Sequence, residues 1–337
     1  MGTVKDLVVI KEAKEKEVGE GIFVFTDHFS VFDYGRMPDL IEGKGHALCL
    51  ISAYFFEKLN EKGINNHYIS LIEDGKSKFV DELEKPTNKM KIKLFRVIKP
   101  KKVGNGYDYS IYKKLPGNFL IPLEVIYRNY LPEGSSIFKR LKEGKITLQA
   151  LGLKEYPMPG QKLERPVIDV STKLETVDRY LTWDEAMEIS GLNKDEMDCI
   201  KKIALKISNI ITLEVEKAEI INEDGKFEFA LDDKRKIIVV DAIGTPDECR
   251  FSFDGFPLSK EIIRMYYRRT EWYKEFEKKK MVEELKNVSR PPNLPSEFKS
   301  LVSKMYKSFC NEIVGRRFFE VPKIKQVVKE LKKYMGR

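Results

Sequence analysis

The sequence has few of the residue types that build disulfide frameworks or zinc sites. Four cysteines and three histidines occur in 337 residues, and no two cysteines stand in C-x-x-C spacing. They are scattered along the chain: Cys49, Cys199, Cys249, Cys310, His28, His46 and His67. Both kinds of site need such residues clustered at short spacing. The sequence therefore indicates neither a disulfide framework nor a zinc site.

Long apolar runs are also absent. No run of eighteen apolar residues occurs, and the first residues lack the charged-then-apolar pattern of a signal peptide. We therefore expect a cytoplasmic protein with no membrane partner. Apolar residues make up 42% of the chain, which is enough for a hydrophobic core.

The excess of positive charge lies at the C-terminus. Residues 296–337 hold eleven Lys or Arg and four Glu, a net charge of +7, whereas residues 1–295 carry +1. A uniform basic face for nucleic acid is therefore not expected on the body. The tail follows the helix-breaking stretch 290–295, and its apolar residues recur at helical spacing. We expect amphipathic helices docked on the body, with solvated basic faces favoured over binding of RNA or an acidic partner.

Residues 224–250 form a predicted β-hairpin with a charged face. Apolar and polar residues alternate from Phe227 to Leu231, and the polar run 232–235 is suited to a turn. Pairing Leu231 with Lys236 leaves three residues on the polar face: Lys226, Glu228 and Asp241. Proteins hold Mg²⁺ with one or two carboxylates plus nucleotide phosphates. The hairpin is thus either a platform for a nucleotide and its metal or a half-buried hairpin with solvated charges.

The pattern elsewhere predicts a mixed α/β chain with no internal repeat. Alternation predicts strands over 4–10, 21–26, 67–72, 92–99 and 120–127. Helical periodicity predicts helices over 44–62, 183–190, 195–216 and 260–280. The first of these follows a Gly-Lys-Gly sequence, which is typical either of a phosphate-binding helix N-terminus or of an ordinary helix entry.

Six segments, in order along the chain, carry motifs of one enzyme family. The hairpin matches paired D-x-K-x-E-F-G and D-E-x-x-x-P-D-x-x-R motifs. The other matching segments are Gly2–Asp6, Thr26–Asp33, Ile41–Gly45, Pro122–Tyr130 with Gly134 and Ser135, and Ser171–Glu175. Together these segments resemble phosphoribosylaminoimidazole-succinocarboxamide synthase, the SAICAR synthetase family of purine biosynthesis. The resemblance spans residues 2–264 and does not cover the tail.

The resemblance implies an α/β fold of the α+β type, with two lobes, mostly antiparallel sheets and ATP bound between the lobes. It implies an ATP-clamping lobe over 1–100 and a substrate and metal-binding lobe over 101–290, before a basic helical extension over 291–337. The implied reaction is ATP-dependent ligation of L-aspartate to carboxyaminoimidazole ribonucleotide. The γ-phosphoryl group of ATP first activates the acid as an acyl phosphate, which the amine then attacks.

The resemblance also assigns residues to the nucleotide and the metal. Glu228 and Asp241 would hold Mg²⁺ against the ATP phosphates. Lys5 and Lys44 would add cationic contacts to phosphate.

Other residues are assigned to the substrates. Arg128, Ser135 and Arg250 would contact the ribonucleotide, because a guanidinium group matches phosphate and carboxylate with two hydrogen bonds. Lys226 and Asp224 would lie beside its reacting end, as the catalytic residues.

Two further candidates lie in the segment 166–179, which we interpret as a turn-rich loop. Lys173 and Glu175 would lie there near the reacting groups, where aspartate could be held. The alternative is that both side chains are only solvated.

Four positions depart from the family pattern. Thr3 replaces a lysine, His28 an arginine, Ala230 a glycine and Ala242 a glutamate. Such losses could retune the site or mark a paralogue. Three hypotheses follow: the amidoligase itself, a diverged ligase or kinase with a different acid or amine, and a nucleotide-binding regulatory protein. A homo-oligomer is compatible with each of them.

Overall fold

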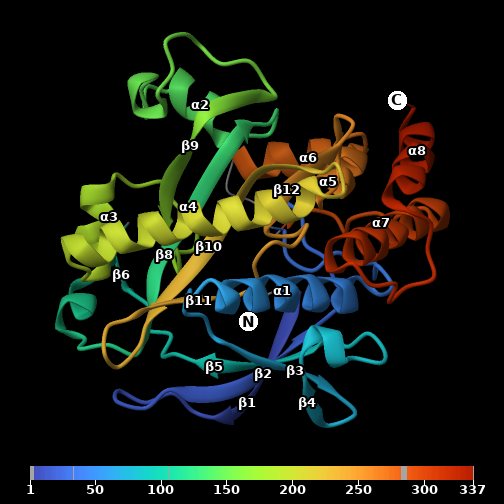
Figure 1. Cartoon of the computed structure of the whole chain (residues 1–337). Coiled ribbons are helices and arrows are strands. Elements are labelled where there is room, and N and C mark those ends of the chain that lie inside the picture. Colours follow the sequence, from blue (N-terminus) through green and yellow to red (C-terminus); the bar gives the residue numbers. More distant parts are fainter. Residues whose placement is uncertain (1–3, 33, 105, 282–286, 337) are drawn as a thin grey trace.

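The computed structural model describes residues 4–32, 34–104, 106–281 and 287–336, and its strands form antiparallel sheets (Figure 1). A five-stranded sheet has the order β1 (Lys5–Lys11), β2 (Gly19–Phe25), β5 (Lys89–Leu94), β3 (Tyr68–Glu73) and β4 (Lys76–Lys78). A six-stranded sheet has the order β13 (Phe256–Pro257), β12 (Cys249–Phe253), β10 (Ile221–Leu231), β8 (Phe119–Leu131) and β9 (Gln161–Thr172), with β11 (Ile237–Val240) paired to β10. A small hairpin joins β6 (Lys101–Val103) and β7 (Gly106–Asp108).

The helices pack around these sheets. They are α1 (Lys44–Glu61), α2 (Ser136–Lys142), α3 (Trp183–Ser190), α4 (Lys194–Glu216), α5 (Glu261–Tyr267), α6 (Glu271–Met281), α7 (Ser296–Val314) and α8 (Ile324–Met335). Short 3-10 turns lie at Val80–Glu82, Ser110–Lys114 and Gln149–Leu151. Within the described residues, no helix has the length and apolar character needed to span a membrane.

The six-stranded sheet has one apolar face, which α4 covers as it runs across β8 and β10 (Figure 1). On this face Val125 lies opposite Phe227, and the Tyr127 ring stacks on Phe227 with centroids 5.0 Å apart. The Tyr127 hydroxyl donates to Asn222, whose amide donates to Thr212 of α4. Because side chains alternate along a strand, the residues between these point to the other face.

The tail forms two helices docked on the body, as its spacing predicted. Helix α7 packs against α1, and the segment before it is fixed at the buried Asp39. The Asp39 carboxylate accepts from the Leu294 backbone N–H at 2.7 Å, from Asn293 at 3.0 Å and from Lys299 at 3.2 Å. In α8 the apolar side chains are buried, and Lys325, Lys329 and Lys333 are exposed.

Two predicted elements were wrong. The segment interpreted as a turn-rich loop is strand β9 as far as Thr172, because it pairs with β8, with Val167 opposite Arg128. The single helix predicted over 260–280 is divided into α5 and α6. Thr270 ends one and starts the other: its hydroxyl donates to the Tyr267 carbonyl and accepts from the Tyr273 backbone N–H.

The predicted hairpin register was wrong by one residue. Leu231 pairs with Ile237, not with Lys236. The turn is longer than expected because the Asp232 carboxylate accepts from the backbone N–H groups of Lys234 and Lys236, and Arg235 adopts φ 59°. The lobe limits at residues 100 and 290 stay a prediction, although the two large sheets lie within residues 5–94 and 119–257.

Candidate functional site

The second face of the six-stranded sheet carries a row of charged side chains. Across β8 and β10, Glu124 lies opposite Glu228 and Arg128 opposite Asp224. On β12, Arg250 lies opposite Asp224. Residues directly opposite in an antiparallel pair point to the same face. The sheet therefore gathers carboxylates and cations from distant parts of the sequence onto one surface.

At one end of this face, lysines and glutamates alternate in space. The Lys226 ammonium donates to Glu124 at 2.8 Å and lies 3.4 Å from Glu248. The Lys173 ammonium lies 2.6 Å from Glu228 and 3.4 Å from Glu124. Burial lowers the pKa of Lys226, but Glu248 and Glu124 outweigh it and raise that pKa well above the usual value. Both lysines are thus held as cations, since the same balance of burial against Glu228 and Glu124 raises the pKa of Lys173.

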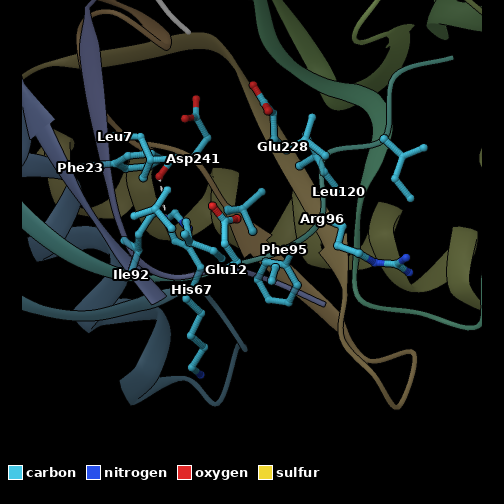
Figure 2. A pocket seen from close by; sticks show the side chains of 17 residues that line it. Leu7, Glu12, Phe23, His67, Ile92, Phe95, Arg96, Leu120, Glu228 and Asp241 are labelled. Atoms are coloured by element: carbon cyan, nitrogen blue, oxygen red, sulfur yellow. Dashed lines mark hydrogen bonds between the residues drawn. The ribbon is translucent and has the colours of Figure 1, made fainter. Parts of the chain in front are cut away.

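Asp241 joins this end of the face through a left-handed turn. Strand β11 ends at Val240, and Asp241 has φ 69°, a conformation uncommon for residues with a side chain. The Nε2 atom of His67 lies 2.9 Å from the Asp241 backbone oxygen, and Lys5 forms an ion pair with the Asp241 carboxylate. Figure 2 shows the carboxylates of Glu228 and Asp241 directed to the same side of one pocket.

The two carboxylates affect one another. Burial, and then the charge of Asp241, raise the pKa of Glu228 to about 7. A divalent cation beside both would offset that repulsion, so this donor set suits a hard cation such as Mg²⁺. Among the described residues no cluster of three or more His, Cys, Asp or Glu is arranged to hold a metal. Two protein carboxylates would therefore leave the remaining ligand positions to phosphate and water.

Beside these carboxylates lies a pocket of about 570 Å³, formed by residues from both large sheets (Figure 2). Its walls are mainly apolar, with Leu7, Phe23, Ile92, Phe95 and Leu120 among the lining residues. An apolar pocket with a few charged groups at one end is the usual form of a small-molecule site. Glu228 and Asp241 are among the residues that line this pocket.

At the other end of the charged face, acidic residues orient arginines. Asp224 accepts two hydrogen bonds from Arg250, at 2.8 and 2.7 Å, and one from Arg128 at 3.3 Å. Asp169 pairs with Arg128 at 3.5 Å and binds Arg140 through both carboxylate oxygens. Arg128 is 1% exposed. Asp224 and Asp169 therefore hold these guanidinium groups in fixed positions.

The start of α2 adds hydroxyl groups to this arginine cluster. The Ser135 hydroxyl accepts from the Ile137 backbone N–H and from Arg128, each at 3.4 Å. The Tyr180 ring lies 3.9 Å from the Arg140 guanidinium carbon, and its hydroxyl accepts from Arg128 at 3.1 Å. Ser135 and Arg128, which the resemblance assigns to the same substrate, are therefore adjacent.

Lys44 is not among the charged residues paired across this face, and its contact with phosphate stays a prediction. Its side chain is fully buried, and its ammonium lies 2.7 Å from Asp247 and 3.1 Å from the His28 carbonyl. The backbone N–H groups of Gly43 and Gly45 donate to the Asp27 carboxylate, at 3.1 and 2.9 Å. The Gly-Lys-Gly sequence is therefore a helix entry capped from within the protein.

Glu175 also lies apart from the charged cluster. Its carboxylate accepts from the Tyr109 hydroxyl at 2.6 Å and from Arg179 at 3.3 Å. Lys173 instead lies within the cluster, because β9 ends at Thr172 and brings it beside Glu124 and Glu228. Of this pair only Lys173 is close to the other candidates, and the expectation that the pair holds aspartate stays a prediction.

Several residues of the face were not predicted. Glu124 could have been found from the P-L-E-V-I-Y-R segment, where it alternates with Arg128. Glu248 follows Asp247 in the P-D-E-C-R turn. No local signal identifies Arg140 and Asp169, since they meet only through the packing of α2 on β9.

The departures from the family pattern have different settings. Ala242 and Ala230 are buried, and His28 has a buried Nδ1 atom without a hydrogen-bond partner among the described residues. Thr3 and Asp33 lie outside the described residues.

Comparison with known proteins identifies the family of this chain. The family model described as SAICAR synthetase matches residues 2–280. This chain belongs to the SAICAR synthetase family. A relative from Archaeoglobus fulgidus, provisionally assigned to the same enzyme, is 56% identical over 336 residues, covering 99% of this chain and 100% of the relative. The phosphoribosylaminoimidazole-succinocarboxamide synthase of Thermoplasma acidophilum is 35% identical, covering 92% of this chain and 99% of the relative.

Solved SAICAR synthetases share the fold. A structure from Saccharomyces cerevisiae, complexed with SAICAR, has a TM-score of 0.64 and 22% identity over 94% of each chain. A SAICAR synthetase in complex with ADP has a TM-score of 0.58 and 24% identity, covering 87% of this chain and 99% of that one. The predicted fold class and the predicted ATP-dependent carbon–nitrogen ligase are confirmed. The SAICAR synthetase motifs were therefore correctly identified from sequence.

Proposed function

We propose that this chain joins L-aspartate to carboxyaminoimidazole ribonucleotide at the expense of ATP, giving the succinocarboxamide of de novo purine biosynthesis with ADP and phosphate. The observation that carries the proposal is the shared sheet face. It places a carboxylate and lysine cluster, next to an apolar pocket, beside arginines that acidic residues hold in position. Two relatives named for this enzyme match this chain over nearly their whole length.

The nucleotide end of the face is formed by Glu228, Asp241 and Lys5. The base of ATP would lie in the apolar pocket, and Lys5 would contact its phosphates once released from Asp241. Mg²⁺, held by Glu228 and Asp241, would neutralise charge on the transferring phosphoryl group. His67 supports this end by fixing the backbone of Asp241.

The ribonucleotide end is formed by the arginine cluster. Arg128 and Arg250, oriented by Asp224, would contact the phosphate or carboxylate of the ribonucleotide, and Ser135 would add a hydroxyl at the start of α2. We assign Asp224 a positioning role, because its oxygens are engaged by two arginines. Arg140 would join the same subsite through Asp169.

Lys226 and Lys173 lie between the two ends and would act as fixed cations. Their raised pKa values make them poor proton acceptors near neutral pH. They would instead stabilise negative charge in two successive steps. The substrate carboxylate first bonds to the γ-phosphorus as ADP leaves, and the aspartate amine then attacks the acyl carbon and expels phosphate.

A co-substrate test decides the proposal. Purified protein is given ATP, Mg²⁺, L-aspartate and the carboxylated ribonucleotide, and ADP and the succinocarboxamide are measured by chromatography with mass detection. We expect ligated product only when both co-substrates are present. Turnover with a different acid or amine would instead select the diverged paralogue, and nucleotide binding without turnover would select a regulatory protein.

A further inference from the structure

We propose that helix α7 of the C-terminal extension positions residues of the site. It holds the segment 247–251 at both ends and thereby sets the positions of Glu248 and Arg250, which lie between. The family model ends at residue 280, so α7 lies outside the region it matches. The inference rests on the proposed function, since it concerns the same substrates.

The first attachment is at Asp247. Its carboxylate accepts from the Tyr306 hydroxyl of α7 at 2.7 Å and lies 2.7 Å from the Lys44 ammonium of α1. All three side chains are buried, with Tyr306 and Lys44 fully so. The Lys44 ammonium also lies 5.6 Å from the centre of the Tyr306 ring. A buried carboxylate held by two donors from two helices is fixed in position, because losing either donor leaves part of its charge uncompensated.

The second attachment is at Phe251. Its ring lies 4.9 Å from that of Phe309, centre to centre. Phe309 follows Tyr306 by three positions, so both point from the same side of α7. Arg250 precedes Phe251 on β12 and therefore points to the opposite face, where it binds Asp224.

The residues between the attachments lie at the end of a tight turn and the start of β12. The Thr245 carbonyl accepts from the backbone N–H groups of Glu248 and Cys249, at 3.1 and 2.8 Å. The Glu248 carbonyl accepts from the Lys226 backbone N–H at 3.2 Å, and its carboxylate lies 3.4 Å from the Lys226 ammonium. Because this turn has little freedom, a shift of Asp247 would be passed on to Glu248 and its lysine partner.

Helix α7 is itself anchored to the N-terminal part of the chain. The Ser303 hydroxyl donates to the Glu42 carbonyl at 2.6 Å, and α7 packs along α1. Figure 1 shows α7 beside one end of α1, on the side where β12 lies. The helix thus has a fixed base from which to support the segment, and its role is to position it rather than to contact substrate.

The test compares a variant that lacks the Tyr306 hydroxyl with a control variant that lacks a tyrosine hydroxyl elsewhere in the extension. Tyr306→Phe deletes the hydrogen bond to Asp247 and keeps the ring. The control is Tyr334→Phe in α8, whose ring stacks on Phe298 at 5.3 Å and whose hydroxyl has no hydrogen-bond partner among the described residues. A second variant, Phe309→Leu, loosens the other attachment while keeping the position apolar.

We expect Tyr306→Phe to lower kcat/KM for the ribonucleotide about tenfold, a change typical of losing a hydrogen bond to a charged group, with KM for ATP within about twofold. Phe309→Leu should act in the same direction, and Tyr334→Phe should match the wild type. Wild-type kcat/KM in both α7 variants, or equal losses for both substrates that follow a lowered Tm, would overturn the inference. If the wild type uses a different acid or amine, the proposed function fails, and the same comparison with that substrate still decides the role of α7.

Discussion

Replacing Glu228 with glutamine separates the charge of this side chain from its shape. Glutamine keeps the volume and an oxygen that can accept from Lys173, which lies 2.6 Å from the Glu228 carboxylate. Glutamine also removes the negative charge of Glu228. Burial and the neighbouring Asp241 disfavour that charge, because they raise the pKa of Glu228 to about 7. Because the folded state disfavours this charge, the variant should fold at least as stably as the wild type.

Activity should change in the opposite direction. In the proposed site Glu228 would be one of two carboxylates that hold the metal, and losing a preorganised charge contact of this kind lowers kcat by about 10² to 10³. We expect that loss in Glu228→Gln, with a weaker dependence of the rate on Mg²⁺. The assay is steady-state release of ADP with both co-substrates saturating and Mg²⁺ varied.

A matched control keeps the comparison specific. Glu57 on α1 also has a raised pKa, due first to burial, and accepts from the Tyr68 hydroxyl at 2.7 Å and from the Val80 backbone N–H at 3.0 Å. Glu57→Gln therefore tests loss of a partly buried carboxylate outside the pocket, and it should keep wild-type kcat. A Glu228→Gln variant with wild-type kcat and wild-type Mg²⁺ dependence would refute the metal assignment.

Three further outcomes are expected. Arg250→Lys keeps the charge but loses the two-point contact with Asp224, so KM for the ribonucleotide should rise roughly tenfold or more; an unchanged KM would remove Arg250 from that subsite. Burial lowers the pKa of His67 to about 4, so between about pH 6.5 and pH 4 the imidazole is protonated in the unfolded chain but not in the folded one. The free energy of unfolding should therefore drop by up to about 3 kcal/mol as the pH falls through this range. Chemical denaturation across this pH range should show a smaller drop in His67→Gln, and an equal drop would contradict the assignment. Arg235→Ala breaks a two-point contact with Glu196, at 2.7 and 2.8 Å, and should cost about 1–3 kcal/mol of stability while kcat is unchanged; loss of activity in the folded variant would be the contrary result.

Motif order and alternation predicted the parts of the site that depend on neighbouring residues. Alternation placed Lys226 and Glu228 on one face, and β10 has both there. The resemblance assigned Arg128 and Ser135 to the same substrate, and the structure brings the two side chains within 3.4 Å of each other. Such groups are fixed by the period of a strand and by the length of one turn, both of which are written locally in the sequence.

Features that depend on long-range packing were beyond sequence reasoning. Asp241 reaches the face through a left-handed backbone held by His67, although the predicted hairpin register brought it there for the wrong reason. Lys44 stands in a Gly-Lys-Gly sequence of a kind that can bind phosphate, yet its ammonium forms an ion pair with Asp247 from a distant turn. In both cases the partner is far along the chain, and no local pattern specifies it.

The central claim is that Glu228 and Asp241 hold the metal of a bound nucleotide beside the pocket formed by both sheets. A crystal structure with Mn²⁺ and a non-hydrolysable ATP analogue tests it most directly, because Mn²⁺ is located by its anomalous scattering. We expect the Mn²⁺ peak within bonding distance of oxygens from both carboxylates, with the base in the apolar pocket. A peak remote from both residues, or a nucleotide bound elsewhere on the chain, would contradict the account.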